Sequence, residues 1–219
     1  MNAPRQDRTS DVITPDGTSE SPARSSRVAR RRDRRKSEIV RTAIGILSTN
    51  GYQGMNLEDV AEQTDIAKAT LYHYFRSKDE LVAAALDVLT EEVMARLAER
   101  AAEVDDSTPT ALLGALVDEQ VRILTEAAPE VATVFSWPRP WPQDIQDSMK
   151  KMRRRHDAVF REVVERGVTN GEFTCPDIDV AMQCLHGILN QSAVWIRPDT
   201  EDKAAARAAV VACVLRLFV

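Results

Sequence analysis

The chain has 219 residues, of which 43% are hydrophobic and 29% charged, and its formal net charge is −5. This content is sufficient for a full core in one or two domains. No apolar run approaches the roughly 20 residues that span a bilayer, which excludes a helical membrane protein. No hydrophobic segment follows the N-terminal arginines, so we expect a cytoplasmic protein without a signal peptide. The three cysteines include no Cys-x-x-Cys pair and are expected to be reduced core residues.

The negative net charge hides an uneven distribution along the chain. Residues 1–36 carry ten Lys or Arg against five Asp or Glu, whereas the remainder carries 19 against 29. An acidic chain of this kind can still bind nucleic acid through its basic end. Residues 1–33 are poor in large apolar side chains, and we expect them to form a disordered basic arm. The arm has two interpretations, a solubilising tail or an arm that follows the DNA backbone or enters the minor groove.

The first amphipathic helix is predicted from Arg35 to Asn50. Apolar side chains recur along it at helical spacing, and Asn50-Gly51 forms a stop signal. We expect this helix to pack beneath a small three-helix domain. The apolar positions are Ile39, Val40, Ala43, Ile44 and Leu47.

The stretch from Met55 to Lys78 predicts two short helices joined by a tight turn. Asn56 can cap the first helix, with Asp59 accepting from the backbone N–H of the cap. Leu71 and Phe75 lie four residues apart in the second helix, so both are expected to face the first. This arrangement predicts a helix-turn-helix, whose second helix enters the major groove of DNA.

The outward face of that second helix is polar and aromatic, whereas a solvated face usually consists of Glu, Lys and Gln. Its side chains can hydrogen-bond phosphates or base edges. The next helix is predicted to begin at Ser77 with a capping box to Glu80, which places Lys78 where a phosphate is favoured. The outward residues are Lys68, Thr70, Tyr72, His73 and Tyr74.

The runs Gly51–Ala61 and Ile66–Leu81 resemble the DNA-binding domain of the TetR family of bacterial regulators, and the resemblance covers about residues 37–86. It implies base-facing positions at Thr70 and His73, and a homodimer formed through about residues 177–218. It further implies binding to a palindromic operator in double-stranded DNA. The complete DNA-binding set that we expect is Asn56, Lys68, Ala69, Thr70, Tyr72, His73, Tyr74 and Lys78.

The remaining chain predicts a helical bundle. A long helix from Ser77 to about Val104 is expected to leave the DNA-binding domain and to act as a mechanical link. No strand-like alternation occurs, so we predict an all-α fold with a helix-turn-helix domain at 34–80 and a bundle of about six helices at 81–219. The other helices are expected to begin at Pro109, Pro129, Gln143, Pro176 and Thr200. The helix that begins at Pro176 is expected to end before Arg197-Pro198.

Candidate effector-binding residues come mainly from a proline-rich loop and the helix predicted at 143–166. Trp137 and Trp141 lie in that loop, where they either plug the core or form a pocket wall. His156 lies on the apolar stripe of the helix, where a core histidine is more common than a ligand contact. Methionines on the same stripe can adapt to apolar ligands. The candidate pocket set is Phe135, Trp137, Trp141, Met149, Met152, His156, Phe160 and Trp195.

The segment 150–155 contains five basic residues. It is either a solvated face or a site for the phosphates of a large anion such as an acyl-CoA. Gly171–Phe173 and Ala193–Pro198 are similar to segments of the CoA-thioester-responsive steroid-catabolism repressors of actinobacteria.

The sequence offers little support for an enzyme. Its three histidines fall on three different predicted helices, and no metal-binding or nucleotide-binding motif occurs, so we expect no catalytic site, metal or cofactor. We therefore predict a repressor that a small apolar or acyl-CoA-type inducer releases from its operator. The alternative is an all-α protein-interaction adaptor, or a nonspecific DNA-binding protein without an effector. An adaptor would leave the basic arm and the Tyr72–Tyr74 face unexplained.

Overall fold

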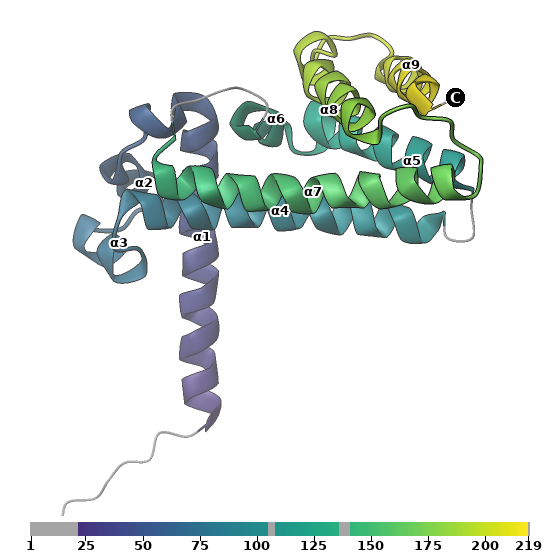
Figure 1. The fold of residues 1–219 in the computed structure, drawn as a ribbon. Helices are drawn as coiled ribbons and strands as arrows, with labels where there is room; N and C mark the ends of the chain where they lie inside the picture. The colour runs from purple at the N-terminus through teal and green to yellow at the C-terminus, as the bar shows by residue number, and fades with distance from the viewer. Residues whose placement is uncertain (1–21, 105–107, 136–140, 219) are drawn as a thin grey trace, which may run out of the picture. The chain divides into compact units, whose positions relative to one another are not determined.

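The computed structural model describes residues 22–104, 108–135 and 141–218. Over these ranges all regular structure is helical, as Figure 1 shows, and the predicted all-α class is confirmed. The chain divides into two units, residues 1–35 and residues 36–219. All packing described below lies within the second unit.

Helix α1 (Pro22–Gly54) begins earlier than predicted. Residues 22–33 are helical, so the expectation of a disordered arm does not hold for them, whereas residues 1–21 lie outside the described ranges. Arginine and alanine are good helix formers, which favours a helix in this arginine-rich segment. At the other end, the backbone of Gly51 is not helical, with φ of 68° and ψ of 178°, so the regular helix is interrupted at Asn50-Gly51 as predicted, and a short helical segment follows to Gly54.

The N-terminal head, which contains the predicted helix-turn-helix, consists of the α1 segment from Lys36, α2 (Leu57–Gln63), α3 (Lys68–Tyr74) and the start of α4 (Lys78–Glu103). Its core is formed where the apolar sides of these helices meet. The periodicity of α1 and the four-residue spacing of Leu71 and Phe75 had predicted this packing correctly. Fully buried side chains there include Ile39, Ala43, Leu47, Val60, Leu71 and Phe75.

Helices α4 and α7 (Gln143–Thr169) lie side by side and run in the same direction, away from the head (Figure 1). The Thr90 hydroxyl contacts the Met152 sulfur at 2.9 Å, and Arg155 forms an ion pair with Glu91. Two long helices therefore connect the head to the rest of the molecule, whereas the sequence had indicated only α4 as a link.

Helices α5, α6, α8 and α9 complete the bundle. Over the described ranges it contains six α-helices, and about six were predicted. Buried Leu113, Leu116 and Val117 place α5 at the centre. A π-helical turn, η1, follows α5 directly and was not predicted. It inserts a wide turn of the kind that often occurs at functional sites. The bounds are α5 Pro109–Arg122, η1 Ile123–Ala127, α6 Pro129–Phe135, α8 Ile178–Trp195, α9 Lys203–Leu215 and the short 3-10 turn η2 Arg216–Phe218.

Gly167 does not end α7 as predicted, because the helix continues to Thr169. A Cβ atom at Gly167 would lie 2.2 Å from the ring of Phe173. The glycine therefore permits close packing of the following segment on the helix. The turn itself is made by Gly171, whose φ of 77° favours glycine.

Candidate DNA-binding surface and effector cavity

The start of α2 is fixed by a reciprocal pair between Asn56 and Asp59. The Asp59 backbone N–H donates to the Asn56 side-chain oxygen at 2.7 Å. The Asp59 carboxylate accepts from the Asn56 side-chain amide at 2.8 Å, rather than from the backbone N–H of the cap as predicted. Asn56 is exposed, and these bonds hold its amide at the helix end.

The turn between α2 and α3 is stabilised by two hydrogen bonds and includes one residue with a left-handed backbone conformation. The hydroxyl of buried Thr64 donates to the Val60 carbonyl at 2.7 Å, and the Ile66 N–H donates to the Ala61 carbonyl at 3.0 Å. Asp65 adopts a left-handed conformation with φ of 51°. These interactions set the angle between the two helices. The sequence had placed the tight turn at these residues without predicting the Thr64 hydrogen bond or the Asp65 conformation.

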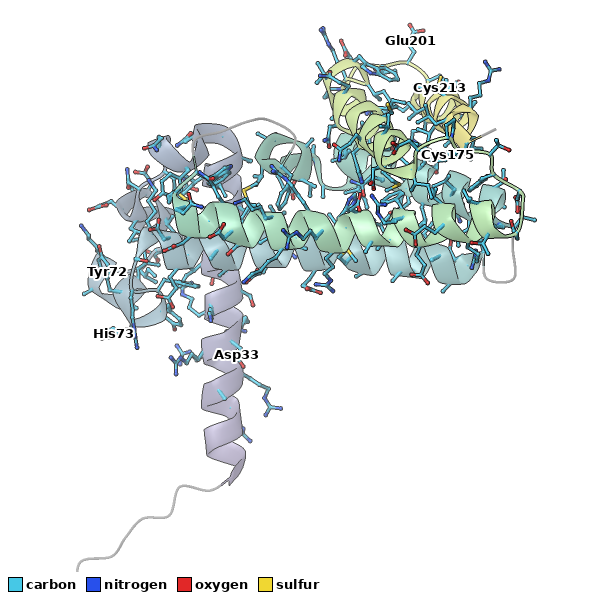
Figure 2. The ribbon with its side chains drawn as sticks, viewed as in Figure 1. Asp33, Tyr72, His73, Cys175, Glu201 and Cys213 are labelled. Atoms are coloured by element: carbon cyan, nitrogen blue, oxygen red, sulfur yellow. The ribbon has the colours of Figure 1, made fainter. Side chains whose placement is uncertain are left out.

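The outer face of α3 carries most of the residues predicted to contact DNA. Leu71 is fully buried and anchors the helix, whereas Tyr72 is 45% exposed. Figure 2 shows Tyr72 and His73 projecting from α3 away from the bundle. Tyr74 is half-buried and packs against the core. The remaining predicted residues on this face, Lys68, Ala69 and Thr70, are exposed.

Two lysines at the edges of this face already have partners. Lys68 forms an ion pair with Glu58, and the hydrogen bond between them raises the pKa of Lys68 and lowers that of Glu58. The half-buried Lys78 places its ammonium 4.3 Å from the ring centroid of Tyr52, a cation–π contact. Both lysines are therefore held at the surface of the head by residues of the head itself.

The beginning of α4 is capped as predicted, with one change of partner. The Ser77 hydroxyl accepts from the Glu80 N–H at 3.1 Å. The Glu80 carboxylate accepts from the Arg76 N–H at 2.7 Å, instead of from the cap residue itself. The head and α4 therefore share a rigid junction beside Lys78.

A buried aromatic contact joins α7 to this junction. Trp141, only 8% exposed, lies just before α7, and its ring centroid is 5.9 Å from that of Tyr52. Tyr52 donates to the Asp79 carboxylate. This hydrogen bond, burial and the negative charge of Asp79 raise the pKa of Tyr52 to about 12. The Trp141 indole N–H is buried without a partner among the described residues. Trp141 thus plugs the core, and Trp137 lies outside the described residues.

A cavity of about 460 Å³ lies among α4, α5, η1, α6, α7 and α8. Apolar side chains come mainly from α4, η1 and α6, whereas α5, α7 and α8 supply polar and charged groups. The lining residues are Thr90, Val93, Met94, Gln120, Leu124, Val131, Phe135, Met152, Arg153, Arg154, His156, Asp157, Arg161, Gln183, His186 and Asn190.

Of the candidate pocket residues, the cavity contains Phe135, Met152 and His156. The other described candidates lie elsewhere. Met149 is a core residue, and Phe160 is fully buried behind His156, with their ring centroids 5.1 Å apart. Trp195 is 51% exposed. It follows the cavity-lining His186 by nine residues, which is two and a half helical turns, so it lies on the opposite face of α8.

A polar network crosses the wall of the cavity. His156 Nε2 lies 2.9 Å from Gln120 Oε1, and His186 Nε2 lies 2.9 Å from Asp157 Oδ1. Arg161 donates to the other Asp157 oxygen at 3.1 Å. Burial, followed by the nearby His186, lowers the pKa of His156 to about 4. Burial opposes ionisation of Asp157, but hydrogen bonds from Arg161 and His186 outweigh it and lower its pKa.

The basic segment 150–155 divides between the surface and the cavity. Lys150 pairs with Asp147 and Arg155 pairs with Glu91, as expected for a solvated face. Arg153 and Arg154 are exposed and also line the cavity, and neither forms an ion pair with a described residue.

Sequence reasoning missed most of the polar lining. Gln120 falls on the apolar face of α5, three residues after the buried Val117, and His186 interrupts the apolar stripe of α8. A buried polar residue on an apolar stripe needs a partner, so these interruptions were the available signal. Their partners could not be paired without the arrangement of the helices.

Helices α8 and α9 also carry exposed apolar positions, including Val180 and Val194. Cys184 and Cys213 are exposed and Cys175 is partly buried, so the expectation of three core cysteines is wrong. Figure 2 shows Cys213 on α9. Among described residues no cluster of three metal-ligating side chains occurs, and no described helix is long and apolar enough to cross a membrane.

Comparison with known families resolves the identity of this architecture. The model for bacterial regulatory proteins of the tetR family matches residues 39–85, and the model for the tetracyclin repressor-like C-terminal domain matches residues 106–217. The chain belongs to the TetR family. The predicted resemblance is confirmed, and this TetR-family protein is a DNA-binding transcriptional regulator of the helix-turn-helix type.

Curated and solved relatives span most of its length. The transcriptional repressor KstR2 of Mycobacterium tuberculosis is 27% identical over 186 residues, covering 78% of this chain and 86% of KstR2. AibR, solved with isovaleryl coenzyme A and operator DNA, aligns with a TM-score of 0.72 at 18% identity, over 84% of this chain and 98% of AibR. FadR of Bacillus subtilis, solved with stearoyl-CoA, aligns with a TM-score of 0.67 at 18% identity, over 83% of this chain and 96% of FadR. Likeness at such identities shows the shared fold.

Proposed function

We propose that this TetR-family protein is a repressor that binds a palindromic operator as a homodimer and leaves it when an acyl-CoA-type ligand occupies the cavity. The observation that carries the proposal is that the same two helices connect the head, which presents the outer face of α3, with the cavity. Helices α4 and α7 both begin at the head, and both supply cavity residues.

The DNA-binding step uses groups that α3 presents outward. Thr70 and His73 carry short polar groups suited to base edges, whereas Tyr72, Tyr74 and Lys78 are suited to phosphates. Because Tyr74 is half-buried, its phenol would reach a phosphate from the edge of the helix. Asn56, Lys68 and Ala69 complete the proposed contact surface.

A homodimer through about residues 177–218 would supply the second recognition helix. The exposed Val180, Val194 and Trp195 on α8 are large apolar side chains that a partner could cover. Exposed alanines along α9 would let a second copy approach closely. Two recognition helices about 34–36 Å apart read half-sites one helical turn apart, and a two-fold dimer therefore reads a palindrome.

The effector class follows from the lining of the cavity. Val93, Leu124 and Phe135 suit an acyl chain, and the exposed Arg153 and Arg154 suit the phosphates of coenzyme A. AibR and FadR are described with isovaleryl coenzyme A and stearoyl-CoA respectively, which supports the same class here.

Release from DNA requires that the ligand favour one arrangement of the two heads. Ligand contacts with Met94 on α4 and Met152 on α7 would bias those helices. A shift of α7 would move Trp141 against Tyr52, whose ring carries the Lys78 ammonium. A second arrangement of this junction would therefore change a proposed phosphate contact directly.

Selection of bound sequences from a random duplex library is the first test. We expect a palindrome to be enriched. Fluorescence anisotropy then measures whether isovaleryl-CoA or stearoyl-CoA releases the protein from that palindrome. Release by either one supports the acyl-CoA class. Enrichment without release by either contradicts that effector class. No enriched sequence, with binding only at low salt, contradicts sequence-specific repression and favours the adaptor or nonspecific alternative.

Three substitutions separate base contacts from phosphate contacts. We expect Thr70→Ala and His73→Ala to lower affinity for the palindrome by about 1–3 kcal/mol, with little loss on scrambled duplex. We expect Lys78→Ala to weaken both duplexes alike and to reduce the salt slope by about one. Glu99→Ala, an exposed change on α4, is the control. Equal losses on both duplexes for all three variants would contradict this assignment.

A further inference from the structure

The helical segment that precedes the head carries a row of arginines along one side. Residues 22–35 form the N-terminal part of α1 and belong to the first of the two units. Residues three and four positions apart lie on the same face of a helix. The arginine stripe, defined by this spacing and by exposed side chains, consists of Arg27, Arg30, Arg31 and Arg34. By the same period, Arg32 lies on the other side of the helix.

The stripe concentrates positive charge in a segment that contains little negative charge. Positions 22–35 include seven arginines and a single acidic residue, Asp33. Like charges three and four residues apart repel each other and destabilise a helix. A row of negative groups alongside would replace this repulsion by attraction, and a guanidinium group can donate two parallel hydrogen bonds to one phosphate. The stripe therefore fits a polyanion with closely spaced phosphates.

The connection of this segment to the head indicates which polyanion it meets. Lys36 follows the segment directly, and its ammonium lies 5.4 Å from the ring centroid of Phe75, the C-terminal cap of α3. The chain therefore enters the head beside the helix proposed to bind in the major groove. At about 1.5 Å per residue, a helix over residues 22–35 extends about 21 Å. Duplex DNA held by the head is thus the polyanion at the highest effective concentration.

We propose that the arginine stripe is a second, sequence-independent DNA-binding element that contacts backbone phosphates beside the site read by α3. The segment is helical, and an α-helix with its side chains is about 10–12 Å wide, whereas the minor groove is about 6 Å wide. The helix therefore follows the phosphates instead of entering the minor groove. Its contacts add affinity for every duplex and leave base preference to α3. This element goes beyond the proposed palindrome recognition and needs no effector.

Removal of two stripe charges tests the element on the full-length protein. Arg30→Gln combined with Arg34→Gln should weaken binding to the selected duplex and to a scrambled duplex alike, by about tenfold at about 0.1 M salt. The slope of log affinity against log salt concentration should become shallower by about two. Fluorescence anisotropy at several salt concentrations gives both quantities. An unchanged slope overturns the proposal, and a loss confined to the selected duplex overturns the assignment to phosphates.

A charge-matched variant separates the stripe from net charge. Lys151→Gln combined with Arg166→Gln removes the same charge from exposed positions on α7 outside the cavity. We expect the salt slope of this variant to equal that of the wild type, because neither residue belongs to the stripe or to the proposed contact surface of the head. A decrease equal to that of the stripe variant would show that net charge alone acts and would overturn the proposal.

Two neighbouring arginines test the helical geometry. Arg31→Gln removes a stripe residue and should reduce the slope by about one, whereas Arg32→Gln removes the same charge from the other side of the helix and should reduce it little. Equal effects would overturn the helical stripe and indicate a flexible tail. Failure to bind any duplex overturns this element and the proposed repression together. The expected slopes without an enriched palindrome support this element and contradict only the proposed operator recognition.

Discussion

The head and the cavity of this protein are specified by the chain in different ways. The outer face of α3 comes from seven consecutive residues, Lys68–Tyr74, which lie between a short turn and the capped start of α4. The cavity takes its lining from residue 90 to residue 190, on five helices and one π-helical turn. The structure of the head can therefore be predicted from local residue spacing, whereas the cavity is formed by residues that are far apart in the sequence.

The two regions also treat polar groups differently. On α3 the polar and aromatic side chains are exposed, and their partners are proposed to be DNA. In the cavity wall, Gln120 and His156 are largely removed from solvent and use each other. Surface substitutions in the head should therefore change binding with little effect on stability, whereas changes inside the bundle should affect both.

The largest contrast is expected from one substitution made at two glycines. Gly167→Ala should lower the free energy of unfolding by about 1–3 kcal/mol, because its Cβ would overlap Phe173 in the bundle. Gly45→Ala in α1 should raise it by about 0.5–1 kcal/mol, because nothing lies within 4 Å of the added atom. Urea unfolding gives both values.

A second change identifies the cause of the Gly167 effect. Adding Phe173→Leu to Gly167→Ala should recover part of the lost stability, since the ring causes the overlap. Strictly additive losses in the double variant would contradict an overlap with Phe173 and would indicate a backbone effect at Gly167 instead.

The local nature of the head explains why its sequence was informative. Asn56, Ser77 and the Leu71–Phe75 pair lie within a few residues of the elements they define, so caps and apolar spacing were sufficient. Even there, the sequence did not give the partner of Asp59, because side-chain and backbone donors of Asn56 are equally near.

The cavity could be predicted only in part. The α7 stripe contains Met152 and His156, which line the cavity, but its pattern did not separate them from Met149, which faces the core. Trp195 was predicted to line the pocket but is exposed on the opposite face of α8. An exposed apolar residue cannot be distinguished from a core residue by the sequence pattern alone. The pairing of Gln120 with His156 requires α5 and α7 to be adjacent, which no local pattern reveals.

The next effect concerns pH and the buried His156. Its pKa falls from an ordinary value of 6.5 to about 4 on folding, so the unfolded chain binds more protons between these values. Stability should therefore be lost as pH falls from about 6.5 towards 4, by roughly 2 kcal/mol at about pH 5. Urea unfolding of wild type and His156→Gln between about pH 7 and pH 5 measures this. Identical slopes for the two proteins would contradict the assignment to His156.

A smaller effect is expected at the contact that joins the two regions. Trp141→Leu should reduce the effector-induced loss of DNA affinity by about tenfold, while DNA affinity without effector and effector affinity without DNA change little. The reason is that Trp141 touches Tyr52, which in turn contacts Lys78 and Asp79. Anisotropy titrations with and without effector give the ratio.

Two further variants make that coupling test specific. Tyr52→Phe keeps the ring and removes the hydrogen bond to Asp79, so it should reduce the coupling less than Trp141→Leu does. Gln143→Leu, exposed near the same helix start, should leave the coupling unchanged. A Trp141→Leu protein with weaker DNA binding but an unchanged ratio would show that Trp141 acts only through packing.

The smallest effect is expected at the edge of the head, where Lys68 is paired with Glu58. Removing the carboxylate by Glu58→Gln frees the lysine for a phosphate and removes a negative charge that repels DNA. Affinity for all duplexes should rise a few-fold, and the salt slope should steepen. Glu62→Gln on the same helix removes an equal charge without breaking that pair, and it separates the two causes. Equal gains in both variants would mean that charge alone acts. A loss in Glu58→Gln would mean that Glu58 positions Lys68 for DNA, and the head would then share the preorganised pairing found in the cavity.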